Sequence, residues 1–370
     1  MHIVMTGGGT GGHIYPALSI AQSLEEHLPT VKIQYVGTAR GLEAQLVPRE
    51  GYDFHCIRAA GLERRLSWKG VAALMETALG FFQARRLLQR IRPCLVIGTG
   101  GYVCGPVVLA AARLGIPTMI HEQNAFPGLT NRLLARVADK VCVTFTESIT
   151  HFPPGAHTVH TGLPIRREIL TTSREVGFKE LNLKSSDFHI LVVGGSRGAQ
   201  SLNRSLAHVY GQLGKMKGLH WIHVTGKNGY NECKRELAEA GIDLGKNGNI
   251  TLVPYLHAME NALAVSDLVI GRAGASFLAE ILARGIPSIL VPYPLASENH
   301  QEYNARAVAG QGAAIMVLEK DLTGEILVKL VTELLKDRER LRAMSASALG
   351  MGRPDAVEGL AHLAMDMLGL

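Results

Sequence analysis

The amino-acid sequence predicts an α/β protein with two Rossmann-like domains, each a parallel sheet covered by helices, that face a cleft. Strand-length apolar runs alternate with helical segments, and a strand that runs into a glycine-rich loop occurs twice, near residues 2 and 189. The chain has 370 residues, which is more than one hydrophobic core usually serves. Such alternation is typical of parallel sheets, whose ligands bind at the carboxyl ends of the strands.

The first sixteen residues hold a strand, a glycine loop and a helix start. Ile3, Val4 and Met5 predict a buried strand, residues 7–12 are almost all glycine, and a helix is expected from 16. Glycine lets the backbone approach an oxyanion, and the positive end of the helix faces it. His13 stands at that end, where the positive potential favours a neutral imidazole that can accept a proton. The alternative is an ordinary strand-to-helix turn with His13 as a surface cap.

The rest of the first half alternates strands and helices in order. The expected strands are 2–6, 32–37, 53–58, 94–98, 117–121, 140–144 and 157–161. The expected helices are 16–27, 40–49, 70–91, 103–114, 128–138 and 146–151. Unusual residues follow three of the strands, at 7–13, 98–102 and 121–124. We interpret the polar run 121–124 as part of a site rather than as an ordinary polar loop, because four polar side chains directly follow an apolar strand.

Residues 161–167 predict a hinge, after which a polar, weakly patterned stretch leads to a repeat of the opening. The run HILVVGGSRGA at 189–199 parallels HIVMTGGGTGG at 2–12, so a second domain of the same type is expected. Its strands are expected at 188–193, 220–225, 250–253, 267–270, 287–291 and 314–318. We therefore expect a first domain of 1–163, a second of 164–349, and a helix of about 350–370 that returns to brace the first.

Composition excludes several classes of protein. No apolar run reaches the ~18 residues of a membrane span, and the first strand begins at once, so neither a spanning helix nor a secretory signal is expected. The five cysteines lack C-x-x-C spacing, which favours a reducing cytosol over a structural zinc site. The net charge of +6 favours an anionic partner, but with 5% aromatic residues and no stacking motif, we expect no nucleic acid.

The first glycine loop does not suit a dinucleotide cofactor. A Rossmann dehydrogenase places an acidic residue at the end of its second strand, ~20 residues beyond the glycines. Here that strand ends YVGTAR at 35–40, without an acid, and the glycine spacing also differs from the dinucleotide pattern. A second glycine loop would have no role in a simple NAD domain.

The second half holds a sharper constellation at 271–280, where a strand runs through small residues into a helix. Amides near Ala275 and Ser276 would be donors at the helix start, which suits a pyrophosphate. Glu280 lies one turn beyond Ser276 on the same face, where its carboxylate can accept hydrogen bonds from ribose hydroxyls. An N-cap serine with an exposed glutamate is the alternative. The amide-rich run 299–304, which follows a strand and a proline turn, favours a sugar site nearby.

These motifs, in this order, resemble the MurG family of peptidoglycan N-acetylglucosaminyltransferases over nearly the whole chain. The resemblance rests on GGTGGH at 8–13, GTARGLE at 37–43, GTGGY at 98–102, HEQN at 121–124, GGSRGA at 194–199 and GASFLAE at 274–280. It implies the two-domain architecture called GT-B. It also implies an inverting transfer of GlcNAc from UDP-GlcNAc to the C4 hydroxyl of MurNAc in undecaprenyl-pyrophosphoryl-MurNAc-pentapeptide, which converts lipid I to lipid II.

The resemblance also implies site residues. His13 matches a proposed base, Leu256 matches a residue whose backbone meets uracil, and Gln301 matches the second of two glutamines that read the sugar. The full set implied to bind UDP-GlcNAc is Thr10, Gly11, Gly12, Asn124, Arg166, Ser196, Leu256, Ala275, Ser276, Phe277, Leu278, Ala279, Glu280 and Gln301. Two positions depart from the family pattern. His300 replaces the first glutamine, and Leu163 stands where asparagine is frequent, so neither role is carried over.

Inversion needs a single displacement, in which a general base takes the proton of the acceptor hydroxyl. His13 is our candidate because it is the only histidine on a first-domain phosphate loop. Amides near Ala275 and Ser276 would stabilise the charge on the leaving UDP. No D-x-D motif is present, so neither a metal ion nor another cofactor is expected. The alternatives are another UDP-sugar transferase, a UDP-GlcNAc 2-epimerase of the same architecture, and a non-catalytic membrane scaffold that binds a nucleotide sugar.

Residues 71–82 are apolar on nearly every face of the expected helix, and basic residues flank them on both sides. The flanking residues are Arg64, Arg65, Lys69, Arg85, Arg86, Arg90 and Arg92. A polyprenyl acceptor stays in the bilayer, so an apolar patch with basic surroundings would suit docking on anionic lipid. We expect a peripheral protein at the cytoplasmic face of the membrane. The alternative is that this helix lies in the core of the first domain.

Overall fold

The computed structural model describes residues 1–370 with the exception of 62–67, 196–197, 243 and 245–248. The chain divides into two compact units. Domain 1 comprises Met1–Ile165 together with Arg353–Leu370, and domain 2 comprises Arg166–Gly352. The sequence predicted domain boundaries at 163/164 and about 350. The observed boundaries, 165/166 and 352/353, lie two or three residues further along the chain.

Domain 1 is built on a seven-stranded sheet in the order β3-β2-β1-β4-β5-β6-β7, with every neighbouring pair parallel. The strands are β1 (His2–Thr6), β2 (Lys32–Gly37), β3 (Asp53–Cys56), β4 (Leu95–Gly98), β5 (Thr118–Glu122), β6 (Lys140–Val143) and β7 (Thr158–His160). The central strands are buried along almost their whole length, as strands with helices on both faces must be. The prediction of a parallel sheet is confirmed for this domain.

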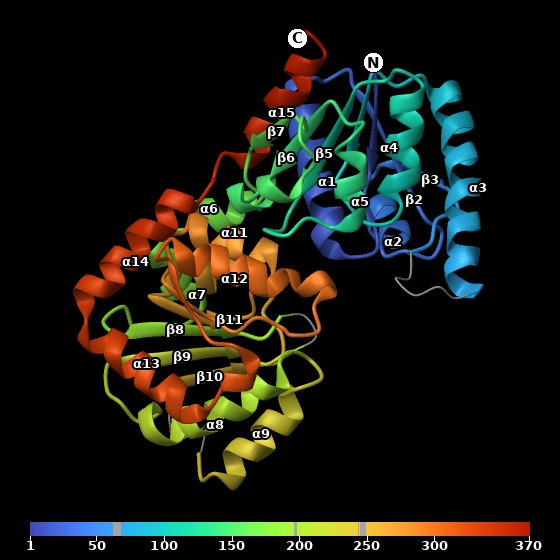
Figure 1. Cartoon of the computed structure of the whole chain (residues 1–370). Helices are drawn as coiled ribbons and strands as arrows, with labels where there is room; N and C mark the ends of the chain where they lie inside the picture. The colour runs from blue at the N-terminus through green and yellow to red at the C-terminus, as the bar shows by residue number, and fades with distance from the viewer. Residues whose placement is uncertain (62–67, 196–197, 243, 245–248) are drawn as a thin grey trace. The chain divides into compact units, whose positions relative to one another are not determined.

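Helices cover both faces of this sheet (Figure 1). They are α1 (Gly11–His27), α2 (Glu43–Arg49), α3 (Trp68–Ile91), α4 (Cys104–Arg113), α5 (Leu129–Leu134) and α15 (Ala356–Met367), with a 3₁₀ helix, η1, at Thr146–His151. Because side chains alternate along a strand, Ile3 and Met5 of β1 pack with α1 and α15, whereas Val4 packs with α3 and α4. Domain 1 therefore has two apolar layers, one on each side of the sheet.

Two helix boundaries in domain 1 differ from the sequence prediction by four or more residues. Helix α1 begins at Gly11, not at residue 16, so Pro16 lies inside the helix and His13 in its first turn. Proline is most frequent at the first helical position, which is why it suggested the later start. The segment expected to be helical at 128–138 forms only α5, and its last four residues form turns instead.

Domain 2 is built on a six-stranded parallel sheet in the order β10-β9-β8-β11-β12-β13. The strands are β8 (Phe188–Val193), β9 (Leu219–Val224), β10 (Ile250–Val253), β11 (Leu268–Gly271), β12 (Ser288–Leu290) and β13 (Ala314–Met316). The six strands occupy their expected places to within two residues at each end. The prediction of a second Rossmann-like domain is confirmed.

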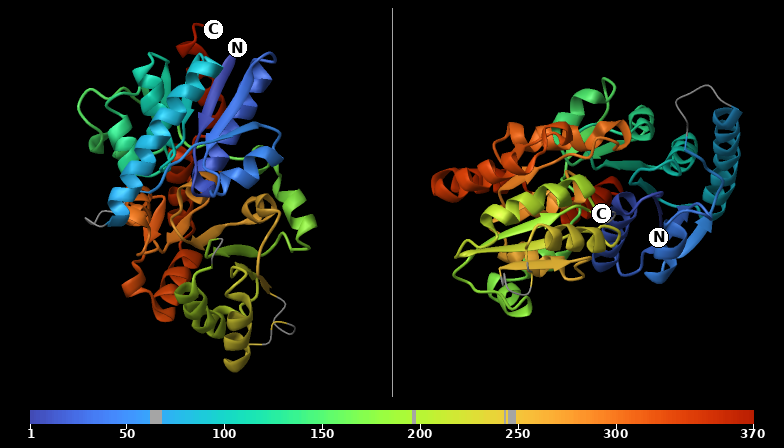
Figure 2. Two further views of the ribbon diagram at one scale, coloured as in Figure 1. Left: turned by 90° about the vertical axis from the view of Figure 1, so that its right-hand side faces the viewer. Right: turned by 90° about the horizontal axis from the view of Figure 1, so that it is seen from below.

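The helices of domain 2 surround this sheet, as further views show (Figure 2). They are α6 (Arg167–Thr171), α7 (Arg174–Glu180), α8 (Gln200–Leu213), α9 (Tyr230–Glu239), α10 (Met259–Val265), α11 (Ala275–Ala283), α12 (His300–Gly310), α13 (Gly324–Lys336) and α14 (Arg338–Met351), with 3₁₀ helices η2 (Ser297–Asn299) and η3 (Glu319–Asp321). The stretch before Asp187, expected to be weakly patterned, contains the two short helices α6 and α7.

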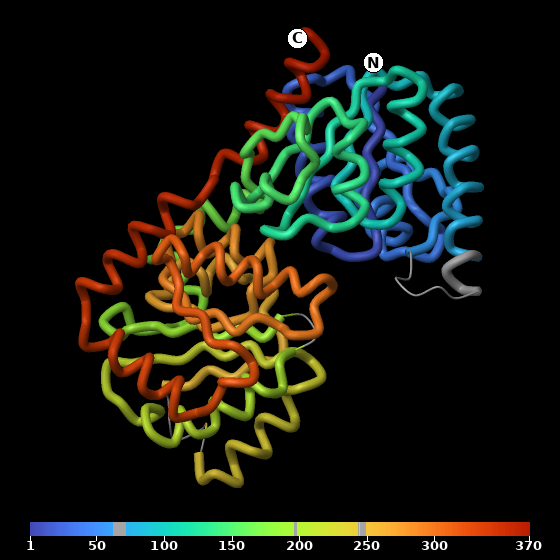
Figure 3. The backbone as a smooth tube through the Cα atoms, viewed as in Figure 1, coloured from blue at the N-terminus to red at the C-terminus, as the bar shows by residue number. Residues whose placement is uncertain are grey.

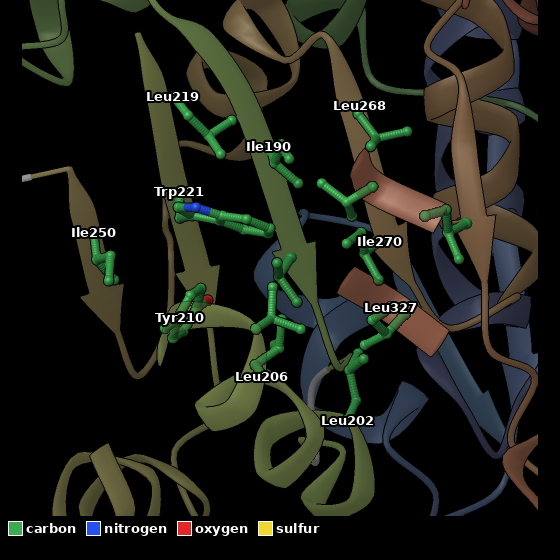
Figure 4. Close-up of a cluster of buried hydrophobic side chains, with 14 of the residues drawn as sticks. Ile190, Leu202, Leu206, Tyr210, Leu219, Trp221, Ile250, Leu268, Ile270 and Leu327 are labelled. Carbon is green, nitrogen blue, oxygen red and sulfur yellow. The ribbon is translucent and has the colours of Figure 1, made fainter. Parts of the chain in front are cut away.

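One core of domain 2 lies between its sheet and helices α8 and α13 (Figure 4). Trp221 of β9 is wholly buried there, and the ring of Tyr210 meets it edge-on with centroids 5.2 Å apart. Leu202 and Leu206 of α8 reach the same cluster from one turn apart, and Leu327 of α13 joins them. This core holds the strands in place, so that their carboxyl ends present loops of fixed geometry.

The end of the chain returns to domain 1 as α15, and the backbone can be followed along this crossing in Figure 3. Leu360, Ala361 and Ala364 of α15 are fully buried and belong to the same apolar cluster as Ile14 and Leu24 of α1. The last helix is therefore an integral part of the core of domain 1. Among the described residues, no helix combines the length and apolar character that crossing a membrane requires.

Candidate active site

The glycine loop of domain 1 leaves the carboxyl end of β1 and lies directly against the loop after β4. The amide of Gly8 donates to the carbonyl of Gly100 at 3.2 Å. Gly101 has a φ of +84°, and a Cβ there would lie only 2.3 Å from the carbonyl oxygen of Gly8. Any larger residue would push the two loops apart. The sequence motifs at 8–13 and 98–102 are thus two halves of one structure.

Glu43, the first residue of α2, holds the glycine loop after β1 through hydrogen bonds. Its side chain is wholly buried, and it accepts hydrogen bonds from the amide of Gly9 at 3.0 Å and from the amide and hydroxyl of Thr38 at 3.1 and 2.8 Å. Sequence reasoning gave Glu43 no role. The available signal was an acid a few residues after β2, but only the structure shows that it turns back into the loop.

His13 lies in the first turn of α1, where its ring is held in one orientation. Nδ1 lies 2.9 Å from the carbonyl oxygen of Gly8 and 3.4 Å from the hydroxyl of Thr10. A carbonyl only accepts, so Nδ1 carries the hydrogen and, in the neutral ring, Nε2 carries the lone pair. The ring lies over Gly100, where a Cβ would come within 2.9 Å of Cδ2. This geometry presents a positioned basic nitrogen beside the glycine loops.

The run 121–124 is mostly structural, which corrects the interpretation of all four side chains as a site. His121, Glu122 and Gln123 are buried, and Glu122 accepts from the side chain of Asn131 and the amide of Gly128 at 2.8 and 3.0 Å. Burial lowers the pKa of His121 to about 4, so the ring is neutral. Asn124 is the partly exposed member, and Glu122 also accepts from its amide at 2.9 Å. Three of the polar residues therefore hold the loop that presents the fourth.

In domain 2, α11 begins after a three-residue turn that follows the carboxyl end of β11. Ala275 is its first residue, and Ser276, in the first turn, is exposed. The first amides of a helix have no carbonyl partner within the helix, and the helix dipole adds positive potential there. Leu278, one of the residues predicted to contact UDP-GlcNAc, has a fully buried side chain. It can therefore contact a ligand only through its backbone.

Glu280, Arg166 and Glu260 form a cluster near α11. Arg166 lies 3.9 Å from the carboxylate of Glu280 and 3.8 Å from that of Glu260, so one cation stands between two acids. The Glu280 side chain is only 16% exposed. Burial raises its pKa to about 7, with Arg166 acting against the rise and Glu260 adding to it. Arg166 and Glu280, both predicted to bind the donor, are 114 positions apart in sequence. The structure brings their side chains together.

Arg272 is a second residue whose role sequence reasoning missed. It is buried in the turn between β11 and α11 and donates to the carbonyl of Val291 at 3.1 Å and the hydroxyl of Ser201 at 3.2 Å. It also pairs with Glu319 of η3. Burial would raise the pKa of Glu319, but the hydrogen bonds and charge of Arg272 outweigh it, so the pKa is lowered. Arg272 therefore ties the turn before α11 to the neighbouring loops.

The remaining predicted residues of domain 2 lie on loops or helix starts. Gln301, in the first turn of α12, accepts from the amide of Tyr293 at 3.0 Å, which orients its NH₂ group as the donor. His300 Nδ1 donates to the carbonyl of Ser297 at 2.7 Å. Leu256 is half-buried between β10 and α10. Ser196 lies outside the described residues.

Two family models and many curated relatives match this chain. The N-terminal domain model of glycosyltransferase family 28 matches residues 3–143, and the C-terminal domain model matches residues 189–360. A UDP-N-acetylglucosamine--N-acetylmuramyl-(pentapeptide) pyrophosphoryl-undecaprenol N-acetylglucosamine transferase of Moorella thermoacetica is 52% identical over 97% of both chains. The crystal structure of MurG from Acinetobacter baumannii has a TM-score of 0.80 and 32% identity, and covers 99% of each chain. The chain belongs to the MurG family.

More distant structures share the fold alone. A UDP-GlcNAc 2-epimerase from Neisseria meningitidis, bound to UDP-GlcNAc, has a TM-score of 0.69 and 14% identity, with 100% of this chain and 99% of that chain covered. The calicheamicin glycosyltransferase CalG4 has a TM-score of 0.66 and 16% identity, with 100% of this chain and 98% of that chain covered. The GT-B fold prediction is therefore confirmed, and the epimerase alternative is not favoured over the MurG family.

The raised pKa of Glu280 predicts a pH-dependent stability. The native state holds a proton that the unfolded chain releases between the ordinary value of 4.5 and about 7, so raising the pH through this interval destabilises the native state. Glu280→Gln cannot titrate. Urea unfolding over a pH series measures the free energy of unfolding of both proteins. We expect the wild-type value to fall relative to Glu280→Gln from about pH 4.5 to 7; a constant difference would contradict the assignment.

Proposed function

We infer that this chain transfers GlcNAc from UDP-GlcNAc to the C4 hydroxyl of MurNAc in lipid I, forming the β-1,4 linkage of lipid II for peptidoglycan. The observation that carries this inference is the 52% identity, over 97% of both chains, with a transferase whose name states that donor and acceptor. The two glycine-rich Rossmann-like domains supply the chemistry that such a transfer needs: a positioned base and donors for a leaving diphosphate.

The donor is proposed to bind domain 2. The diphosphate of UDP would accept hydrogen bonds from the first amides of α11 near Ala275 and Ser276, which also favour the charge that develops on leaving UDP. Glu280, one turn further, would accept from the ribose hydroxyls. The backbone of Leu256 would meet uracil, and the NH₂ group of Gln301 would donate to the sugar. Arg166 lies 3.9 Å from Glu280 and would favour the ionised carboxylate, against the burial that raises the pKa of Glu280.

The acceptor is proposed to bind domain 1. Its pyrophosphate would meet the glycine loops after β1 and β4, close to the start of α1, where the helix dipole favours an anion. Nε2 of His13 would take the proton of the C4 hydroxyl as the new bond forms. Thr10, Gly11 and Gly12 at the start of α1, together with Asn124 on the loop after β5, are proposed to contact UDP-GlcNAc. The reaction inverts the anomeric carbon because it consists of one displacement.

Incubation with UDP-GlcNAc and a lipid I analogue tests the function directly. We expect a product that carries GlcNAc on the acceptor, together with one UDP released for each transfer. An epimerase would instead convert UDP-GlcNAc without any acceptor, and a non-catalytic scaffold would bind UDP-GlcNAc without forming product. Either of those outcomes would contradict the proposal.

Glu280→Ala should raise the KM for UDP-GlcNAc. The lost hydrogen bonds to a charged acceptor are worth roughly 1.5–3 kcal/mol, or about tenfold to a hundredfold in binding. Glu280→Gln keeps one acceptor oxygen and should show a smaller rise. Initial rates at varied donor concentration measure the effect, with Glu239→Ala, an exposed acid of α9, as the control. Unchanged donor kinetics in a folded Glu280→Ala protein would remove the ribose role.

His13→Ala should lower kcat far more than it weakens UDP binding, because a general base acts mainly in the transition state. The expected loss is roughly 10²–10⁴-fold. Calorimetry gives the Kd for UDP beside the kcat at saturating substrates, and His157→Ala, an exposed histidine of domain 1, serves as the control. If UDP affinity collapses while kcat holds, His13 is a ligand of phosphate and another group is the base.

Helix α3 is the proposed membrane-docking element. One face is buried, through Ala73, Ala84 and Leu88, so the core-helix alternative holds for that face. The opposite face exposes Leu74, Met75 and Phe82 by 60%, 63% and 59%. Their spacing places them along one side of the helix.

Basic residues lie next to this apolar face. Arg85, Arg86 and Arg90 of the same helix are exposed, and Arg92 follows it. Arg64 and Arg65 lie outside the described residues, and the side chain of Lys69 is likewise not described. Each near-surface cation contributes ~1 kcal/mol on anionic lipid. We propose that this face seats the protein peripherally on the cytoplasmic leaflet, where its lipid acceptor lies.

Replacing Leu74, Met75 and Phe82 together with serine should abolish sedimentation with anionic vesicles. These exposed side chains add little to folding, so activity on a short-chain, water-soluble acceptor should remain. The matched control is Met216→Ser, which changes a methionine of domain 2 that is 48% exposed. Undiminished vesicle binding by the triple variant would place the docking surface elsewhere.

A further inference from the structure

A cluster of two histidines and a glutamate lies at the end of α1 that is remote from the glycine loop. His27 is the last residue of α1, and Glu358 and His362 lie one turn apart on α15, which packs along α1 (Figure 2). One ligand atom from each residue lies within 4.8 Å of the other two. We propose that His27, Glu358 and His362 bind a divalent transition-metal cation of the zinc class, which clips α15 to α1.

The hydrogen bond of His27 fixes which of its nitrogens faces the cluster. Nδ1 lies 2.8 Å from the carbonyl oxygen of Ser23, so Nδ1 carries the hydrogen and Nε2 the lone pair of the neutral ring. Nε2 lies 3.3 Å from Oε2 of Glu358. A lone pair and a carboxylate oxygen at that separation repel unless a proton or a metal cation lies between them. A backbone carbonyl that orients a histidine in this way is the usual support of a metal ligand.

The separation between His27 and Glu358 matches a tetrahedral site, and the ligand atom of His362 lies within 4.8 Å of both. Metal–nitrogen and metal–oxygen bonds of about 2.0–2.2 Å put two ligand atoms of a tetrahedron roughly 3.4 Å apart. The measured 3.3 Å between His27 and Glu358 agrees with this. The rings of His27 and His362 meet edge-on with centroids 5.2 Å apart, so a nitrogen of each can point at one ion. Two imidazoles and one carboxylate favour Zn²⁺ over Mg²⁺ or Ca²⁺.

The position of the cluster indicates a structural function. His27 and His13 are fourteen residues apart on one helix, which corresponds to roughly 21 Å at ~1.5 Å per residue, so an ion here takes no part in the transfer chemistry. The side chains of His27 and Glu358 are 32% and 50% exposed, so an ion can enter from solvent and keep water in its fourth position. Because α15 is the last segment of the chain, binding only to the folded form would stabilise its attachment.

Equilibrium dialysis and thermal unfolding of the full chain, first freed of metal with EDTA, test the site at pH 7.5. We expect one Zn²⁺ per chain and a Zn²⁺-dependent rise in Tm that Mg²⁺ does not produce. His27→Gln and His362→Ala should each weaken Zn²⁺ binding by ~10-fold or more and remove the rise, whereas His157→Ala should keep both. Comparing each variant with and without Zn²⁺ separates metal binding from any loss of the His27–Glu358 ion pair.

Three results would overturn the proposal. The first is a wild-type Tm that does not respond to Zn²⁺, which would leave only a proton between His27 and Glu358. The second is a Zn²⁺ response that survives in both His27→Gln and His362→Ala. Substitution of Co²⁺ identifies the ligands, since nitrogen and oxygen ligation lacks the thiolate charge-transfer band that binding at the exposed Cys56 would give. A thiolate band would also contradict the site.

Discussion

The buried carboxylate of Glu43 is the constraint on which the glycine loops of domain 1 depend. A charge taken out of water is stable only when hydrogen bonds replace its hydration, and Glu43 obtains them from Gly9 and Thr38 at the carboxyl ends of β1 and β2. These hydrogen bonds hold the loops after β1 and β2 in one conformation in the absence of substrate. They also use the amide of Gly9. An anionic ligand of this loop must therefore bind through the first amides of α1, which is the end of the helix that holds His13.

Domain 2 also holds its loops through a buried charged side chain, which in this domain is a cation. Its sheet has the same order of central strands, but the buried ion is the cation Arg272, held by Glu319, Ser201 and the carbonyl of Val291. Arg272 stands three residues before α11, so the network places the start of that helix. The two domains thus share an architecture but hold their loops differently. In domain 1 the carboxylate of Glu43 is held by uncharged donors, whereas in domain 2 the guanidinium of Arg272 is neutralised by Glu319.

The sheets could be predicted because buried parallel strands are short apolar runs, and the turn motifs between them are local. Elements that depend on long-range packing could not. Helices α6 and α7 are short and polar, so they lack the helical periodicity of apolar residues that would predict them. Pro16 suggested a late start for α1, although the helix tolerates it in its second turn. For the candidate site, Glu280 could be proposed from its spacing to Ser276, and its role stays a prediction. The structural roles of Glu43 and Arg272 could not be predicted, because their partners lie about 34 and 47 residues away in sequence.

A chain of hydrogen bonds connects the domain crossing to His13, the proposed base. Gly162 has a φ of +80°, and a Cβ there would lie 2.4 Å from Cβ of Arg353, so the outgoing and returning segments touch on domain 1. His121 donates from Nε2 to the carbonyl of Gly162 at 2.8 Å, and its Nδ1 accepts from Gln123 at 3.1 Å.

Gln123 also donates to the carbonyl of Thr99 at 2.6 Å, and the hydroxyl of Thr99 donates to the carbonyl of His13 at 2.7 Å. Every donor in this chain meets an acceptor only while His121 is neutral, and burial, which lowers its pKa to about 4, keeps it so. Protonation would set an N–H of His121 against the N–H of Gln123. The low pKa therefore allows Gly162, at the domain crossing, and the first turn of α1, which carries His13, to be held by one uninterrupted network.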